Sequence, residues 1–347
     1  MAYTTINKHT AHFNTKLYTG NGSTNAITGV GFQPDWVWIK SRGAADNHNL
    51  FDVLRGANKY IYSNDAQAEV TDTNRLNSFD SDGFTLGDDE DVNENGDTLV
   101  SWNWKANGAG SANSDGTLAS TVSVNTAAGF SIVKYTGNGS SGATVGHGLG
   151  AKPKVIILKS YENGQQWASY WSALGATKYM RFNTVNAEAT SAARWNNTEP
   201  TTSVFTIGND GEVNTNTEDH IAYCFAEKPG YSKFGSYAGN GNANGPFIYT
   251  GFKPVFIIYK AFSGPNSADN WEMADNKRSP FNGVENVLYP NLSNAEGTGV
   301  TTRLDLLSNG FKIRTGSSDY NGSGVSYIYM AFGQTLVGSN NIPCTAR

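Results

Sequence analysis

A five-residue motif, Tyr-(Thr/Ala)-Gly-Asn-Gly, occurs three times in this chain of 347 residues. After each copy comes an apolar run that starts at a Pro and ends, six positions later, at a Lys. The motifs occupy 18–22, 135–139 and 237–241, and the Pro-to-Lys runs occupy 34–40, 153–159 and 254–260. A fixed internal pattern of this kind predicts one β-rich unit used three times, and it favours a structural building block over a single active site.

Three further landmarks follow each run in the same order: an Asn-x-x-x-Ala-Glu stretch, a short aromatic strand and a hydrophobic closing strand. They lie at 64–69, 183–188 and 291–296; at 83–86, 204–207 and 310–313; and at 100–104, 221–225 and 328–332. This order predicts an N-terminal arm (1–12), repeat 1 (13–106), a Gly/Ser/Asn-rich linker (107–129), repeat 2 (130–227), repeat 3 (228–333) and a C-terminal tail (334–347).

The composition indicates an all-β fold. Charged residues make up 16% of the chain and aromatic residues 12%, and Gly, Asn, Ser and Thr are abundant, which is typical of short antiparallel strands joined by turns. The apolar runs 155–158 and 255–258 predict strands buried on both faces, whereas the helical spacing of Trp167, Trp171 and Leu174 predicts a short helix. We therefore expect three tandem β-sandwich-like repeats with short helical turns.

Several classes of protein are disfavoured. The net charge is −5 and no Lys/Arg run is present, which argues against nucleic-acid binding. No apolar stretch approaches the roughly 18 residues of a membrane span, and the first residues have no signal-peptide core, so we expect synthesis in a cytoplasm without export. The two cysteines, Cys224 and Cys344, cannot form a disulfide framework for three domains. No Gly-x-Ser-x-Gly or His-Glu-x-x-His motif occurs, so we assign no catalytic residue.

The acidic run 88–97 contains the best candidate metal site. Its alternating oxygen-bearing side chains match the first half of a calcium loop. The candidate ligands are Asp91, Asn93, Asn95 and Asp97. The position that should carry a bidentate Glu is occupied by Trp102. A calcium site and a hairpin loop rich in Asx turns are the two alternatives, and no other cofactor is expected.

A Lys at the end of each Pro-to-Lys run recurs together with the Glu of each Asn-x-x-x-Ala-Glu stretch. We predict that each Lys forms a partly buried ion pair with the Glu of its own repeat, and three copies favour an architectural role over a catalytic one. The predicted pairs are Lys40 with Glu69, Lys159 with Glu188, and Lys260 with Glu296.

Four of the eight tryptophans lie in less regular stretches than the others: Trp167, Trp171, Trp195 and Trp271. Exposed aromatic rings in such stretches could bind sugar faces, which makes these four residues candidate glycan ligands. The alternative is that all eight tryptophans fill three small cores.

Several longer stretches of the sequence resemble a known family. Met-Ala-Tyr-Thr-Thr-Ile opens the chain, Phe-Gln-Pro-Asp-Trp-Val-Trp-Ile-Lys ends at Lys40, and Gly-Tyr-Ser-Lys-Phe-Gly-Ser-Tyr ends at Tyr237. Over essentially its whole length the chain resembles a repeat family of virion structural or fibre-like proteins from tailed bacteriophages of marine bacteria. At 331–334 it reads Ala-Phe-Gly-Gln where that family often has Ala-Phe-Ala-Glu. The resemblance carries over no catalytic residues.

The resemblance and the repeats together predict a non-enzymatic bacteriophage virion structural protein, namely a tail or head fibre component or a capsid decoration. We expect it to be displayed on the particle as a homo-oligomer, with a trimer as the first guess, and to contact other virion proteins. A glycan-binding module that recognises host surface carbohydrate is the alternative, and a glycan-cleaving tail enzyme with paired carboxylates is a third.

Overall fold

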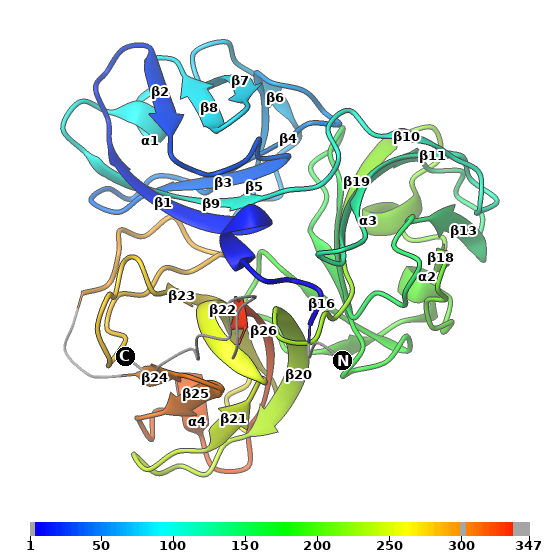
Figure 1. The fold of residues 1–347 in the computed structure, drawn as a ribbon. Coiled ribbons are helices and arrows are strands. Elements are labelled where there is room, and N and C mark those ends of the chain that lie inside the picture. The colour runs from blue at the N-terminus through cyan, green and yellow to red at the C-terminus, as the bar shows by residue number, and fades with distance from the viewer. Residues whose placement is uncertain (1–3, 299–302, 336–347) are drawn as a thin grey trace.

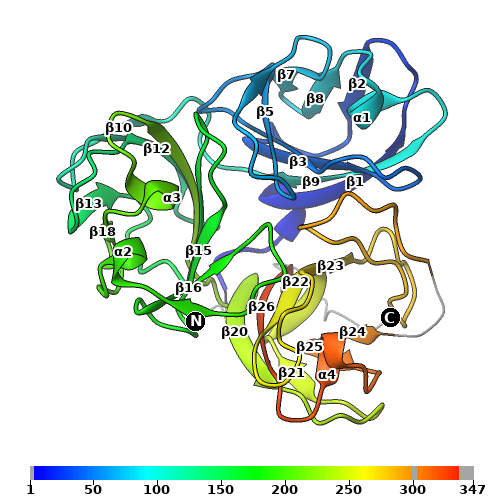
Figure 2. The same ribbon diagram turned by 180° about the vertical axis from the view of Figure 1, so that it is seen from behind.

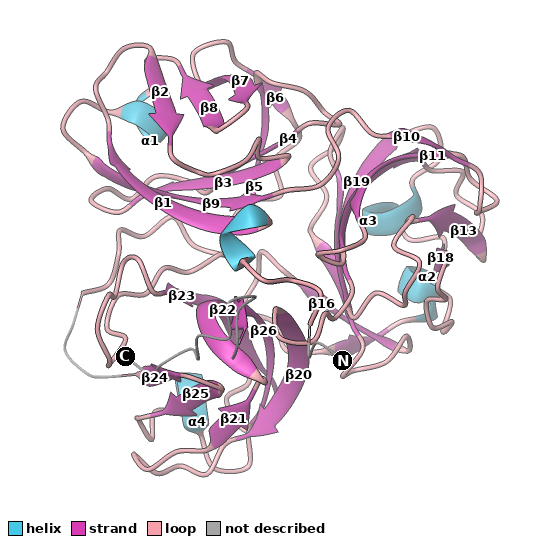
Figure 3. Cartoon of the chain, viewed as in Figure 1, coloured by secondary structure: helices cyan, strands magenta, loops and turns pink. Residues whose placement is uncertain are grey.

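The structure, a computed structural model, describes residues 4–298 and 303–335. In these ranges the regular elements are mainly β-strands that pair antiparallel, and each helix is a single turn of three or four residues. Figure 3 shows how strands dominate the molecule. The prediction of an all-β fold with short helical turns is therefore confirmed.

We call residues 13–106, 130–227 and 228–333 segments 1, 2 and 3. Segment 1 follows η1 (His9–Ala11) and contains β1 (Phe13–Thr19), β2 (Asn25–Thr28), β3 (Trp36–Ser41), β4 (Asn49–Asp52), β5 (Lys59–Tyr62), β6 (Val70–Thr71), β7 (Leu76–Asp80), β8 (Gly83–Leu86), α1 (Glu90–Asn93) and β9 (Thr98–Trp104). Between segments 1 and 2 lie β10 (Ser111–Asn113) and β11 (Ser120–Asn125).

Segment 2 contains β12 (Phe130–Thr136), β13 (Ala143–Gly146), β14 (Val155–Ser160), β15 (Ala168–Trp171), β16 (Lys178–Arg181), β17 (Ala189–Thr190), α2 (Ala192–Trp195), β18 (Val204–Ile207), α3 (Gly211–Asn214) and β19 (Asp219–Phe225). Segment 3 contains β20 (Ser232–Ala238), β21 (Phe247–Tyr249), β22 (Phe252–Ser263), β23 (Glu272–Asp275), β24 (Leu304–Leu307), β25 (Gly310–Ile313), α4 (Ser318–Asn321) and β26 (Ser326–Thr335).

Each segment has one large and one small sheet. The large sheets share a four-strand order, namely β1-β9-β3-β4, β12-β19-β14-β15 and β20-β26-β22-β23. The small sheets are β2-β8-β7, β13-β18 and β21-β25-β24. Figures 1 and 2 show the three segments as three lobes around a common centre, with segment 1 in blue and cyan, segment 2 in green, and segment 3 from yellow to red.

The large sheets are buried on both faces. In β3, Trp36 and Trp38 belong to a central apolar cluster shared by all three segments, whereas Val37 and Ile39 face the small sheet of segment 1. In β14, Ile157 belongs to the central cluster and its neighbours Ile156 and Leu158 to the core of segment 2, and β22 behaves in the same way. Because successive side chains of a strand point to opposite faces, a continuous apolar run fits this position. The prediction of doubly buried strands is confirmed.

The predicted helix around residue 170 is wrong, because this stretch is strand β15. Trp167 and Trp171 lie in the central cluster, and Ala168 and Tyr170 lie in the core of segment 2. Apolar residues that serve two faces of a strand also fall at helical intervals, so spacing alone could not separate the two structures.

The predicted linker 107–129 is also more than a connection. Its two strands extend the large sheet of segment 2, since β10 pairs with β11 and β11 pairs with β12. On the other side of segment 1, the described part of the arm packs on the body, where Ile6 is buried in the central cluster. The predicted tail lies outside the described residues from 336 onward.

Candidate functional site

The Tyr-x-Gly-Asn-Gly motif is a tight turn held against the end of a short helix that comes later in the same segment. In segment 1 the Tyr18 hydroxyl donates to the Val92 carbonyl at 2.8 Å. A Cβ on Gly20 would lie 2.0 Å from the Glu94 carbonyl oxygen, so only glycine allows this approach. Gly22 has a φ of 62°, in the left-handed region that favours glycine. The first glycine thus permits close contact and the second permits the turn, which explains the spacing of the motif.

A buried asparagine, which the sequence reasoning missed, closes each of these turns. The side-chain oxygen of Asn93 accepts from the Asn21 backbone N–H at 3.0 Å, and its amide donates to the Gly87 carbonyl at 2.6 Å. The matching residues of segments 2 and 3 are Asn214 and Asn321, which accept from Asn138 and Asn240 at 2.8 Å each. All three asparagines are fully buried. The signal was present in the sequence, because each is preceded at four positions by the Asp or Ser that stands at the helix N-cap.

The structure does not assemble the predicted calcium loop. Asp91 pairs with Arg75 at 2.8 Å, Asn93 is committed to the turn, and Asp97 accepts from the Ser41 hydroxyl and the Thr98 N–H. The fourth candidate, Asn95, packs its Cβ 3.1 Å from the Cβ position of Gly22. In the described ranges no group of three or more His, Cys, Asp or Glu side chains is arranged to hold a metal ion. The oxygens serve the turn and the helix instead.

The three segments are joined into a closed ring by one backbone hydrogen bond that occurs at each junction. The N–H of Glu69 donates to the Tyr161 carbonyl at 2.6 Å, linking segment 1 to segment 2. The N–H of Glu188 donates to Phe262 at 3.0 Å, and the N–H of Glu296 donates to Arg42 at 2.9 Å. The acceptor always lies two positions after the Lys that ends the Pro-to-Lys run. The third bond therefore returns from segment 3 to segment 1 and closes the ring.

The three lysines donate to backbone carbonyls. Lys159 donates to the Ala66 carbonyl of segment 1 at 2.6 Å, and Lys260 donates to the Val185 carbonyl of segment 2 at 2.9 Å. Lys40 donates to Ser41 and Ala44 within its own segment, at 2.7 and 2.8 Å. Burial lowers the pKa of each of the three ammonium groups to about 8. Two of these lysines thus fasten neighbouring segments together.

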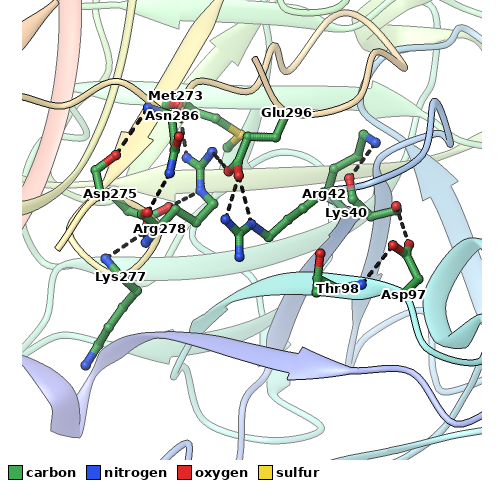
Figure 4. A network of polar contacts seen from close by, with 12 residues as sticks. Lys40, Arg42, Asp97, Thr98, Met273, Asp275, Lys277, Arg278, Asn286 and Glu296 are labelled. Carbon is green, nitrogen blue, oxygen red and sulfur yellow. Dashed lines mark hydrogen bonds and ion pairs between the residues drawn. The ribbon is translucent and has the colours of Figure 1, made fainter. Parts of the chain in front are cut away.

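The predicted pairing of each Lys with the Glu of its own repeat is therefore wrong. Glu69 pairs with Arg55 and Lys59, at 3.3 and 3.0 Å, and Glu188 pairs with Lys178 at 2.5 Å. Glu296 accepts from Arg278 and, across the junction, from Arg42, at 2.9 and 2.6 Å; Figure 4 shows its carboxylate between the two guanidinium groups. The buried ammonium groups of the three runs are instead bound by backbone carbonyls, and the glutamates pair with other cations.

All four tryptophans proposed as glycan ligands are buried. The exposed fraction is 1% or less for Trp167, Trp171, Trp195 and Trp271. Two of them bridge segments, because the Trp167 ring N–H donates to the Tyr62 carbonyl at 2.9 Å and that of Trp271 donates to Arg181 at 3.0 Å. The alternative, in which the tryptophans fill three small cores, is right about burial but not about the cores. Seven of the eight lie in the central cluster shared by the three segments, and Trp195 lies in the core of segment 2. These side chains present no face to a sugar.

Two of the three junctions contain a buried ion pair with an aromatic donor. At the junction of segments 1 and 2, Asp52 pairs with Arg55 at 2.6 Å and accepts from the Tyr223 hydroxyl at 2.8 Å. Between segments 3 and 1, Asp275 pairs with Arg278 at 2.6 Å and accepts from the Trp102 ring N–H at 3.1 Å. The recurring Asp-x-x-Arg spacing is visible in the sequence.

The third junction, between segments 2 and 3, is apolar at the same positions. Trp171 occupies the place of the Asp, Leu174 that of the Arg, and Met330 that of the aromatic donor. Trp171 stacks on Trp271 of segment 3 with ring centroids 5.5 Å apart.

The match to a known family treats these three segments as one unit. The family model described as "Domain of unknown function (DUF7483)" matches residues 8–335, which includes every strand described above. The chain belongs to the DUF7483 family. The search of curated proteins and the search of solved structures give no match. Among the described residues of this DUF7483 chain, no helix is long and apolar enough to cross a membrane.

Proposed function

We propose that this DUF7483 protein is a non-enzymatic virion structural protein of a tailed bacteriophage. It would be displayed on the particle as a tail or head fibre component or as a capsid decoration, in contact with other virion proteins. The resemblance of its longer phrases to fibre-like virion proteins suggests the particle, and the geometry of the molecule supports the structural role.

The observation that supports this proposal most is the closed ring. The residues that recur along the chain hold turns and join segments. A buried Asn closes each turn, and the N–H of each Glu and two of the three lysines join neighbouring segments. A site of catalysis would need one optimal set of groups, whereas architecture uses the same set three times. The recurring hydrogen-bonding residues are therefore best explained by a structural role.

The fold also suits display. The three lobes lie around a shared core, so one chain presents three lobes at fixed relative positions (Figure 1). Several such chains on one particle would let weak contacts with a host surface add up, because binding of one raises the effective concentration of the next. The glycan-binding alternative loses the tryptophans that motivated it.

The test is whether the protein belongs to the purified particle. Virions purified by density gradient should contain this chain in stoichiometric amounts by mass spectrometry, and cryo-electron microscopy should reveal the three-lobed body at a fixed position. A phage-encoded cytoplasmic enzyme followed in parallel is the control for contamination. If the protein is abundant in the infected-cell lysate but is removed from the particles together with that enzyme, the virion role is wrong.

A further inference from the structure

The outer edge of β21 in segment 3 is open in the described part of the chain. β21 ends the sheet order β21-β25-β24 and pairs with β25 on one side. The side chains of Phe247 and Tyr249 are 46% and 57% exposed, whereas Ile248 between them is buried. An open edge strand presents backbone N–H and C=O groups to any chain that can pair with it.

The register shows which residues face this edge. The Ile313 N–H donates to the Pro246 carbonyl at 3.1 Å, and the Thr250 N–H donates to Asn309 at 3.0 Å. In an antiparallel ladder the hydrogen-bonded positions recur at every second residue, so Ile248 directs its backbone groups toward β25. The N–H and C=O groups of Phe247 and Tyr249 consequently point away from β25, toward the open edge.

The equivalent edge in segment 2 is closed by the chain itself. The Leu118 N–H donates to the Thr144 carbonyl of β13 at 3.0 Å, and the Ser120 hydroxyl donates to the Gly146 carbonyl at 3.0 Å. Leu118 also forms a parallel bridge with Val145. In segment 2 the edge strand β13, which is equivalent to β21, is thus already covered by another part of the chain.

The edge strands of the three small sheets, β2, β13 and β21, differ in the size of two side chains. Phe247 and Tyr249 flank the residue paired with Phe311, just as Thr144 and Gly146 flank the one paired with Phe205. In segment 1 the same two positions are Ala26 and Thr28. Of the three equivalent edges, that of segment 3 alone carries aromatic side chains. The Phe247 ring covers Gly310 of β25, and both rings remain about half exposed.

We propose that β21 is a self-association edge, on which β21 of a second copy of this chain adds antiparallel. With the twofold axis at Ile248, Phe247 lies opposite the partner subunit's Tyr249, and Tyr249 lies opposite the partner subunit's Phe247. The outward N–H and C=O groups of both residues then form two hydrogen-bonded pairs. Two three-stranded sheets become one six-stranded sheet.

A second copy fits this edge better than an unrelated chain for two reasons. The strand is its own complement, because Phe247 and Tyr249 carry both the backbone groups that point to the open edge and the exposed aromatic rings. Cross-strand aromatic pairs stabilise a sheet, and a self-complementary patch generates the twofold symmetry that most oligomers use. β21 also contains no charged residue of the kind that natural edge strands use to prevent pairing.

The test is sedimentation velocity of the full chain over a wide concentration range, and it does not depend on the virion role. We expect a monomer–dimer equilibrium, and the variant Phe247→Ala with Tyr249→Thr should weaken it at least tenfold. These replacements are the residues that segment 1 has at the same positions, so the variant should keep its fold, which circular dichroism and thermal melting check.

The matched control is Phe281→Ser, which removes an aromatic side chain of segment 3 that is 78% exposed but lies outside the strand. This variant should dimerise like the unmodified chain. A chain that is monomeric at every concentration overturns the proposal. So does a double variant that dimerises as tightly as the unmodified chain, or a control that is weakened equally, since the contact would then be general surface hydrophobicity.

Discussion

The junction between segments 1 and 2 and the junction between segments 2 and 3 have similar backbone geometry but opposite chemistry. Both use a Glu N–H to a carbonyl two positions after a Lys, and both use that Lys to donate to the preceding segment. At the first junction Asp52 of the buried Asp52–Arg55 pair accepts a hydrogen bond from the Tyr223 hydroxyl. At the second junction Trp171 stacks on Trp271. The backbone frame therefore sets the position of the segments, and the side chains that fill it can be ionic or apolar.

This difference matters because the two solutions fail in different ways. A buried ion pair costs desolvation of both charges and contributes little net stability, but removal of one partner leaves the other charge buried and unpaired. A stacked pair of tryptophans has no such liability, and a modest truncation costs only the lost packing.

The largest effect is expected from Asp52→Ala. It leaves the buried Arg55 guanidinium with the Leu50 carbonyl and, as its remaining carboxylate among the described residues, Glu69 at 3.3 Å. Loss of one partner of a buried pair costs about 3–5 kcal/mol. Asp275→Ala should cost less, since Arg278 keeps Glu296 at the shorter distance of 2.9 Å. Urea unfolding followed by tryptophan fluorescence measures both.

The control is Asp305→Asn, which breaks a pair with the more exposed Arg314 at 3.4 Å and should have little effect. The double variant Asp52→Leu with Arg55→Leu should recover most of the loss, because no charge is then left unpaired. Equal losses for Asp52→Ala and Asp305→Asn would show that the buried pair is not the difference between the junctions.

A smaller effect is expected from Trp171→Phe at the apolar junction. The change reduces the stack on Trp271 and removes a hydrogen bond to the Ser169 hydroxyl, which should lower the free energy of unfolding by about 1–2 kcal/mol. The same urea experiment measures it. A loss greater than that of Asp52→Ala would reverse the comparison, because the apolar junction would then be the more sensitive one.

The smallest effect concerns the pH dependence of the lysines that the junctions share. Burial lowers the pKa of Lys260 from 10.5 to about 8 in the folded state. Below pH 8 the lysine is charged in both states, and between 8 and 10.5 the unfolded state holds more protons, so this group makes stability rise with pH. Lys260→Met should flatten the rise between about pH 7.5 and 9.5, below the range in which tyrosines ionise.

Chemical denaturation at a series of pH values measures this slope. Lys233→Met, at a side chain that is 37% exposed, is the control for loss of a lysine at the surface. If Lys260→Met keeps the pH dependence of the free energy of unfolding of the unmodified chain, the pKa of Lys260 does not differ between the folded and unfolded states.

The local features of this fold were predictable from the sequence, whereas the contacts between segments were not. The apolar run at 155–158 indicated a strand buried on both faces, and Gly22 indicated a turn with positive φ, because each depends on a residue and its near neighbours. A recurring Lys and a recurring Glu show that both have a constant environment. They do not show which copy supplies the partner. Here the glutamate N–H binds the next segment, while its carboxylate pairs with an arginine or with a lysine outside the Pro-to-Lys runs.

The stretch around Trp167 shows a second limit. Its apolar spacing fits a helix and a doubly buried strand equally well, and the pairing of β15 with β14 decides for the strand. A candidate cation site failed for a related reason, since the same Asn and Asp oxygens that could bind calcium also close turns and cap helices. The sequence identifies oxygen-rich positions, but only the fold shows where the oxygens point.

The covalent connection of the three segments also has a consequence for how such a molecule can change. A ring assembled from three identical chains carries every substitution at all three junctions at once, so a harmful change is tripled. In this chain, one junction holds Trp171 and Leu174 where the other two hold an Asp–Arg pair, and one edge strand carries aromatic rings where its counterparts carry small residues. Each junction and each lobe can therefore change by itself while the remaining two keep the ring intact.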